Sequence, residues 1–198
     1  SLLSLMPAYG EVRASDGVNA IFYRRDAVEV IQQGCFALSD TPEVIGSKGW
    51  DGAYPRLALW AVMRHRASRR EFVIINTHLD HLGEVARREG ARLIVSRLPK
   101  IAGKLPTIVT GDFNTDSNGD AYKTLAAVLT DANSAAQKRI GAKHSWHNFC
   151  RLPMNKRSTI DFVMVSGNVT PKLAEVPHEC PGAMLSDHSP VIATLQLP

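Results

Sequence analysis

Four short polar clusters contain residue types that could do chemistry, and each lies inside a strand-like run or at its end. They are "INTHLDH" (75–81), "TGDFN" (110–114), "TIDFV" (159–163) and "LSDHSP" (185–190). Taken singly, most have plain structural explanations, as turns rich in Asp and Asn or as a hydrogen-bonded histidine. Asp161 is a stronger indication of a functional site, because acids are depleted from strands and are costly to bury without a partner. It either faces solvent or pairs with a buried cation such as a histidine.

Together the clusters suit the hydrolysis of a phosphate ester. This reaction needs a divalent cation on the phosphate oxygens, a base for water, and donors for the extra negative charge. Asp187 can supply a carboxylate oxygen to Mg²⁺, directly or through water. His188 can act as a base or a phosphate contact, held and charge-tuned by Asp161. Asp112 can orient the attacking water or serve the leaving group, and Asn114 can donate to the transition-state oxygens.

Length and composition fit one globular domain and restrict the function little. The chain has 198 residues, with 44% hydrophobic and 21% charged residues, which is ordinary for a soluble protein. The net charge of +4 tolerates an anionic substrate, but nucleic-acid binding would require a concentrated basic face. The densest basic stretch, "RHRASRR" (64–70), reads as a solvated hairpin tip between two strands. No apolar run approaches the roughly 20 residues that span a bilayer.

The expected elements mix strands with two helices. Apolar spacing along one face predicts helices over 83–102 and 120–132. A long loop at 39–55 separates early strands from late ones. Hairpins and helical crossovers both occur, which indicates an α/β sandwich rather than a purely parallel sheet. The predicted strands are 18–25, 27–38, 56–64, 70–79, 107–114, 158–167 and 190–198.

In this order, the clusters resemble the endonuclease/exonuclease/phosphatase superfamily from Asn76 to Pro190, and the stretch 20–61 is similar to its bacterial hydrolase branch. The resemblance implies a four-layer α/β sandwich, with two mixed β-sheets packed face to face and flanked by helices, as one domain over 1–198. It implies a divalent-metal-dependent phosphoesterase that hydrolyses a phosphodiester or phosphomonoester by water attack, with Mg²⁺ or Mn²⁺ as cofactor. The substrate would be a small molecule, a phospholipid head group or a nucleic acid. A bacterial protein that is periplasmic or secreted is expected.

The likeness also assigns roles to residues of this chain. Asp187 would lie on the metal side of the site. Arg56, in "YPRLALW", would reach the substrate phosphate, although a salt bridge across the loop would explain it equally well. Trp146, His147 and Phe149 could shape the pocket or simply pack. The catalytic residues that the resemblance implies are His78, Asp112, Asn114, Asp161 and His188.

One departure from the family pattern concerns the start of the chain. The family opens with a strand that carries an Asn and a helix that ends in "QE", whose Glu is the main metal ligand. Neither is present, and Glu11 lies after the place where that helix should end. We therefore expect an N-terminally truncated domain, which would expose an apolar sheet edge and bind Mg²⁺ weakly.

Three other interpretations compete. "NTHLDH" is close to the H-x-H-x-D-H of metallo-β-lactamase-type zinc hydrolases, but Asn76 stands where the first His should be. A serine hydrolase that uses Ser186 or Ser189 with His188 would lack the G-x-S-x-G elbow. A degenerate module that binds phosphate without cleaving it would explain the missing Glu, but not the retained acids and histidines.

The sequence leaves substrate, oligomeric state and compartment open. Specificity is expected in loops 39–55 and 145–156, and neither has the basic and aromatic density of single-strand binders. This favours a small phosphate ester or a phospholipid head group over duplex DNA. The three cysteines allow one disulfide at most, so a pairing of Cys150 with Cys180 stays open.

Overall fold

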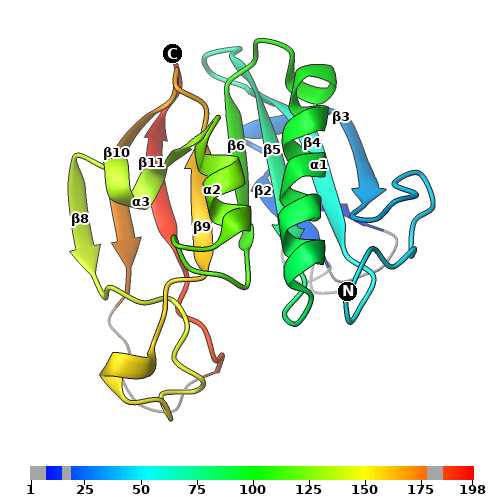
Figure 1. Ribbon diagram of the computed structural model, residues 1–198. Helices are drawn as coiled ribbons and strands as arrows, with labels where there is room; N and C mark the ends of the chain where they lie inside the picture. Colours follow the sequence, from blue (N-terminus) through cyan, green and yellow to red (C-terminus); the bar gives the residue numbers. More distant parts are fainter. Residues whose placement is uncertain (1–7, 15–18, 178–184) are drawn as a thin grey trace.

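A six-stranded mixed sheet forms the centre of the fold in the computed structural model, which describes residues 8–14, 19–177 and 185–198 (Figure 1). Its order is β3-β4-β5-β6-β9-β7, in which β5 and β6 are parallel and the other neighbours antiparallel. Helix α1 (Glu84–Ala102) makes the crossover from β5 to β6. The strands are β3 Val28–Ala37, β4 Leu57–His65, β5 Glu71–His78, β6 Thr107–Asp112, β7 Thr130–Asp131 and β9 Asp161–Val165.

Two smaller sheets lie on one face of the central sheet and two helices on the other. In Figure 1, α1 and α2 (Asp120–Ala126) stand in front of the central sheet. The small sheets are an antiparallel pair and a mixed three-stranded sheet of order β11-β10-β8. The predicted α/β sandwich of mixed sheets is confirmed, with a second layer divided into two sheets in the described part of the chain. Their strands are β1 Tyr9–Arg13, β2 Ala20–Arg24, β8 Lys138–Gly141, β10 Thr170–Val176 and β11 Ile192–Gln196.

The apolar run in β5 is covered on both faces, as the sequence predicts. Val73 and Ile75 are fully buried in the cluster that contains the helices. Phe72 and Ile74, which alternate with them, pack against the cluster under β1 and β2. A strand with apolar cover on both faces is held rigidly, because each buried aliphatic side chain contributes roughly 1.5–3 kcal/mol. The polar residues at the end of β5 are therefore firmly positioned.

The basic stretch forms the β4–β5 hairpin, where three of its arginines pair with a single glutamate. Arg64, Arg66 and Arg69 all lie within 3.1–3.3 Å of carboxylate oxygens of Glu29 on β3. β4 enters this hairpin and β5 leaves it, so the hairpin and His78 lie at opposite ends of the sheet. The arginines therefore do not reach the candidate site.

Several element predictions need correction. The helix predicted over 120–132 ends at Ala126, because Leu129 turns into the core and is followed by β7 and the short helix α3 (Ala132–Ala135). The strands β1, β8 and β10 were not predicted, and the exposed β8 has no apolar alternation to reveal it. A 3-10 turn occupies Met154–Lys156. Cys180 lies outside the described residues.

Candidate active site

Strand pairing alone brings three of the predicted residues together. β5 ends at His78, β6 ends at Asp112, and β9 begins at Asp161. In the register of the sheet His78 is opposite Asp112, and Asp112 is opposite Asp161. The three side chains therefore emerge from adjacent strands at one edge of the sheet, as the polar clusters at strand ends predict.

Gly111 makes this register possible. A Cβ atom at this position would lie 2.0 Å from the carbonyl oxygen of Thr77 on the neighbouring strand. No side chain can be accommodated at that distance, so only glycine lets β6 approach β5 this closely. The glycine of "TGDFN" thus sets the position of the aspartate that follows it.

His188 reaches the same edge from the loop before β11, held by the segment 145–148. The carbonyl oxygen of Asp187 accepts hydrogen bonds from the backbone N–H groups of His147 and Asn148, at 3.0 and 3.1 Å. The N–H of Ser189 donates to the carbonyl oxygen of Ser145 at 2.7 Å. The imidazole then lies with Nδ1 2.7 Å from Oδ2 of Asp161. Of the two alternatives for Asp161, this contact is the pairing with a histidine, and the aspartate side chain is only 21% exposed.

The carboxylate of Asp112 lies between two histidines. Its Oδ2 atom is 3.4 Å from Nε2 of His78 and 4.0 Å from Nε2 of His188. The same Nε2 atom of His188 is 4.0 Å from Oδ2 of Asp187. A cavity of about 700 Å³ opens over this group. Its lining residues are Tyr54, Arg56, His78, His81, Asp112, Asn114, Trp146, Ser158, Ile160, Asp187 and His188.

The environment separates the proton affinities of these groups. Burial, together with the nearby Asp161 carboxylate, raises the pKa of Asp112 to about 6, against the opposing hydrogen bond from the Asn114 N–H. Burial lowers the pKa of His78 to about 4, helped by the charges of Arg56 and His188. The hydrogen bond to Asp161 raises the pKa of His188. Near neutral pH, His78 is therefore neutral and Asp112 can exchange a proton, while Asp161 favours the protonated form of the His188 imidazole.

Asn114 shapes the loop after β6. Its backbone has φ 50°, a left-handed conformation that Asn tolerates better than most residues. Its N–H donates to Oδ1 of Asp112 at 2.8 Å, and its side-chain amide donates to the carbonyl oxygen of Leu79 at 2.9 Å. One amide N–H is therefore engaged in holding two loops together. The side chain still lines the cavity, where its other N–H can be used.

Arg56 makes the ion pair that was one of its two explanations, and its side chain also faces the cavity. Its Nε atom lies 3.6 Å from Oδ2 of Asp80, which is an ion pair across the loop. That nitrogen is buried and makes no hydrogen bond within the described residues. The side chain also lines the cavity beside His78. A cation in this position is well suited to an anionic ligand.

Sequence reasoning missed Tyr54, His81 and Asp80. Tyr54 belongs to the loop 39–55, and the other two stand in "NTHLDH", so only their segments were flagged. Of the three residues expected to shape the pocket, Trp146 lines it. His147 is fully buried, and its Nδ1 accepts the N–H of Cys150. Phe149 is exposed and does not line this cavity.

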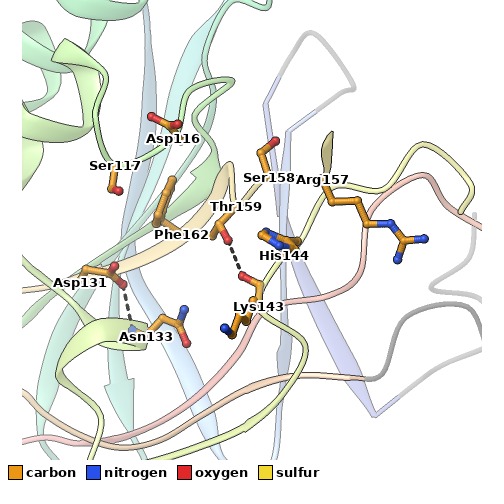
Figure 2. A pocket seen from close by; sticks show the side chains of 10 residues that line it. All are labelled: Asp116, Ser117, Asp131, Asn133, Lys143, His144, Arg157, Ser158, Thr159 and Phe162. Carbon is orange, nitrogen blue, oxygen red and sulfur yellow. Dashed lines mark hydrogen bonds between the residues drawn. The ribbon is translucent and has the colours of Figure 1, made fainter. Parts of the chain in front are cut away.

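A second, smaller pocket of about 330 Å³ adjoins the first and shares Ser158 with it (Figure 2). Figure 2 shows Asn133 and Lys143 on one side, Asp116 and Ser117 on the other, and Arg157 directed away. The acids are already engaged, since Asp131 accepts the N–H of Asn133. None of the catalytic candidates lines this pocket, so we place the chemistry in the larger cavity.

The carboxylates around the cavity are suited to a divalent cation. Ligand atoms of Asp112, Asp161 and His188 all lie within 4.8 Å of one another. The hydrogen bond between Asp161 and His188 occupies two of them, which leaves Asp112, together with the 44% exposed carboxylate of Asp187. Burial raises the pKa of Asp112 because the negative charge of the carboxylate is unfavourable there. A proton or a bound metal ion would neutralise that charge. Oxygen donors of this kind fit Mg²⁺.

Comparison with known proteins gives one family. The sequence profile described as "Endonuclease/Exonuclease/phosphatase family" matches residues 5–188. A crystal structure of an endonuclease/exonuclease/phosphatase from Bacteroides vulgatus is 37% identical, with a TM-score of 0.94, and the match covers 100% of this chain and 79% of that one. A mannosyl-6-phosphatase from Bacteroides thetaiotaomicron is 31% identical, with a TM-score of 0.89, over 99% of this chain and 80% of the other.

A more distant similarity is to nocturnin. Nocturnin of Drosophila melanogaster is 33% identical over 110 residues, which is 54% of this chain but 16% of that protein. The chain thus spans only a small part of the length of this relative. The human nocturnin catalytic domain shares the fold, with a TM-score of 0.75 at 19% identity, over 100% of this chain and 75% of that one.

No helix in the described residues is long and apolar enough to cross a membrane.

Proposed function

Because this chain belongs to the endonuclease/exonuclease/phosphatase family, we propose that it hydrolyses a phosphate ester by attack of water on phosphorus in the larger cavity. The observation that carries this proposal is the Asp112 carboxylate, placed between two histidines and with a pKa raised to about 6. A carboxyl group that titrates near neutrality can take a proton from water during attack and release it afterwards. A site for binding alone has no need of such a group.

The two histidines divide the remaining work. His188, whose protonated form Asp161 favours, donates to a phosphoryl oxygen and stabilises the charge that develops there. His78 is neutral, so its imidazole N–H can hydrogen-bond the oxygen of the leaving group, which takes its proton from water as it departs. Separate environments that drive two imidazoles to different charges are typical of acid–base sites.

Arg56 and Asn114 complete the contacts to the phosphate group. The guanidinium of Arg56 provides a fixed positive charge, and the second amide N–H of Asn114 provides a neutral donor. Asp187, whose carboxylate is 44% exposed, is the residue that would hold Mg²⁺ or Mn²⁺ beside Asp112. When bound, the cation would supply positive charge to the phosphate oxygens and to the developing alkoxide.

The substrate class that we favour is a small phosphomonoester. The mannosyl-6-phosphatase is 31% identical over 99% of this chain, which supports a phosphorylated sugar as the first substrate to test. The basic hairpin is at the far end of the sheet, so its arginines are not available to a nucleic-acid backbone bound at the cavity. A periplasmic or secreted location stays a prediction.

The proposal is tested by inorganic phosphate release from mannose 6-phosphate and glycerol 3-phosphate, and by release of the aryl alcohol from an aryl phosphodiester, with Mg²⁺, with Mn²⁺ and with EDTA. We expect release that depends on the metal ion and is removed by Asp112→Ala and by His188→Ala. The matched control is His65→Ala, which removes a partly exposed histidine in the distant hairpin and should leave the rate unchanged. Release that survives both active-site substitutions would overturn the proposal.

A further inference from the structure

Two aromatic rings stand together on the wall of the cavity. The rings of Tyr54 and His81 are stacked, with centroids 5.6 Å apart and an interplanar angle of 22°. Both line the cavity beside the candidate phosphate site, and Tyr54 remains 61% exposed. None of the hydrolysis steps proposed above uses either ring. A flat aromatic pair in a polar cleft offers a surface on which another ring can pack.

Asp80 holds together the two loops that carry this aromatic pair. Its carboxylate is buried, and Oδ2 accepts the N–H of Tyr54 at 3.1 Å while Oδ1 accepts the N–H groups of Leu82 and Gly83 at 3.0 and 2.8 Å. Burial by itself would raise the pKa of this carboxyl, but the backbone donors outweigh it and hold the pKa below its usual range. One ionised side chain thus fixes the loop before β4 to the loop after β5, and with them both rings.

Arg56 connects the aromatic pair to the phosphate site. Its guanidinium carbon lies 6.0 Å from the centre of the Tyr54 ring, and its Nε atom lies 3.6 Å from Oδ2 of Asp80. A phosphate bound to Arg56 would therefore be separated from the aromatic pair only by the Arg56 side chain itself. A group in contact with the rings must be joined to the phosphorus by only a few bonds.

We infer that Tyr54 and His81 form a ring-binding wall that Asp80 positions, and that the substrate carries a sugar or nucleoside ring close to its reacting phosphate. This inference rests on the proposed function and narrows its substrate class. The apolar C–H face of a pyranose and the face of a nucleobase share the required chemistry, since each packs on an aromatic plane. Arg56 binds the phosphate while the wall selects what the phosphate is attached to.

The wall is tested by titration calorimetry on the Asp112→Asn protein, so that binding is measured without turnover. The ligands are mannose 6-phosphate, adenosine 5′-monophosphate and the ring-free glycerol 3-phosphate. Adding Tyr54→Ala should weaken at least one ring-bearing ligand about tenfold and glycerol 3-phosphate less than about twofold, as expected for loss of one stacking contact. Tyr54→Phe should restore the affinity. The control Phe22→Ala removes an aromatic residue of similar exposure on β2 and should change nothing.

The ligand that depends on Tyr54 identifies the source of the ring, a sugar or a base. Equal weakening of all three ligands, or no weakening of any, overturns the inference. Binding that depends on Tyr54 without turnover by the wild-type protein would leave the wall intact and refute the hydrolysis proposal instead. Turnover by the wild-type protein with binding that does not depend on Tyr54 would support the hydrolysis proposal and refute the ring-binding wall.

The positioning role of Asp80 is tested with a double-mutant cycle. If Asp80 acts on ring binding through Tyr54, then Asp80→Asn should weaken the ring-bearing ligand, and adding Tyr54→Ala to it should cost little more. Thermal melts verify that each variant is folded. Additive losses in folded variants would show that Asp80 does not position the wall.

Discussion

Nδ1 of His188 lies 2.7 Å from Oδ2 of Asp161, although 26 residues separate them in the chain. Asp161 is the first residue of β9, and His188 is in the loop before β11. The contact raises the pKa of His188 and fixes which ring nitrogen faces the cavity. It therefore determines the charge and the orientation of the imidazole that faces Asp112.

Asp161→Asn should lower the pKa of His188 and slow phosphate release by a factor of roughly 100 or more, as for a lost acid–base orienter. Because the folded pKa of His188 is raised, the contact stabilises the fold fully below the unfolded value of 6.5 and less as pH rises through the folded value. The variant should thus lose more stability at pH 5.5 than at pH 9. Histidine NMR titration and thermal melts at both pH values measure these effects. A His188 pKa that does not change would contradict them.

Asp112→Asn should make the protein more stable at neutral pH while removing activity. The folded pKa of Asp112 is raised to about 6, so the fold favours the protonated carboxyl, and that contribution is lost as pH rises through 6. The amide cannot ionise and avoids this loss. A rise in Tm of roughly 5 °C at pH 7.5, and little change at pH 4, is expected. Asp187→Asn, at a more exposed carboxylate, serves as the comparison. A lower Tm for Asp112→Asn at pH 7.5 would show that burial of the ionised Asp112 carboxylate does not destabilise the fold.

His78→Ala should affect poor leaving groups more than good ones. A neutral imidazole that donates to the leaving oxygen matters most when that oxygen is strongly basic. We expect a loss in kcat of roughly 100-fold or more with an alkyl phosphate, and a much smaller loss with a nitrophenyl phosphate. Steady-state kinetics on the two esters compare them. Equal losses would place His78 away from the leaving group.

Gly111→Ala should destabilise the fold strongly. The added methyl group would meet the Thr77 carbonyl oxygen at 2.0 Å, which forces β5 and β6 apart next to the site. A loss of at least about 3 kcal/mol is expected, since backbone atoms must move. The control is Gly167→Ala, where nothing lies within 4 Å of the added carbon. Urea unfolding of both variants measures the difference, and similar stabilities would show that the close approach is unimportant.

The positions of the catalytic candidates could be predicted because each stands at a strand end, where local sequence pattern is informative. Asp161 is an example, since an acid in an apolar strand required a partner and has one in His188. The role of Asp80 in fixing Tyr54 could not be predicted, because that partner lies in a loop 26 residues away. The end of α2 was missed since Leu129 continues the helical pattern but packs into the core. Long-range contacts of this kind leave no periodic signal.

The most direct test of the central claim is the pH dependence of kcat/KM for phosphate release from mannose 6-phosphate in saturating Mg²⁺. If Asp112 is the base, kcat/KM rises with pH as the carboxyl loses its proton, with a midpoint near its pKa of about 6 or below it where the cation adds positive charge. Asp112→Asn should abolish this limb together with the activity. A wild-type profile without an acidic limb, or an active Asp112→Asn protein that keeps it, would contradict the account.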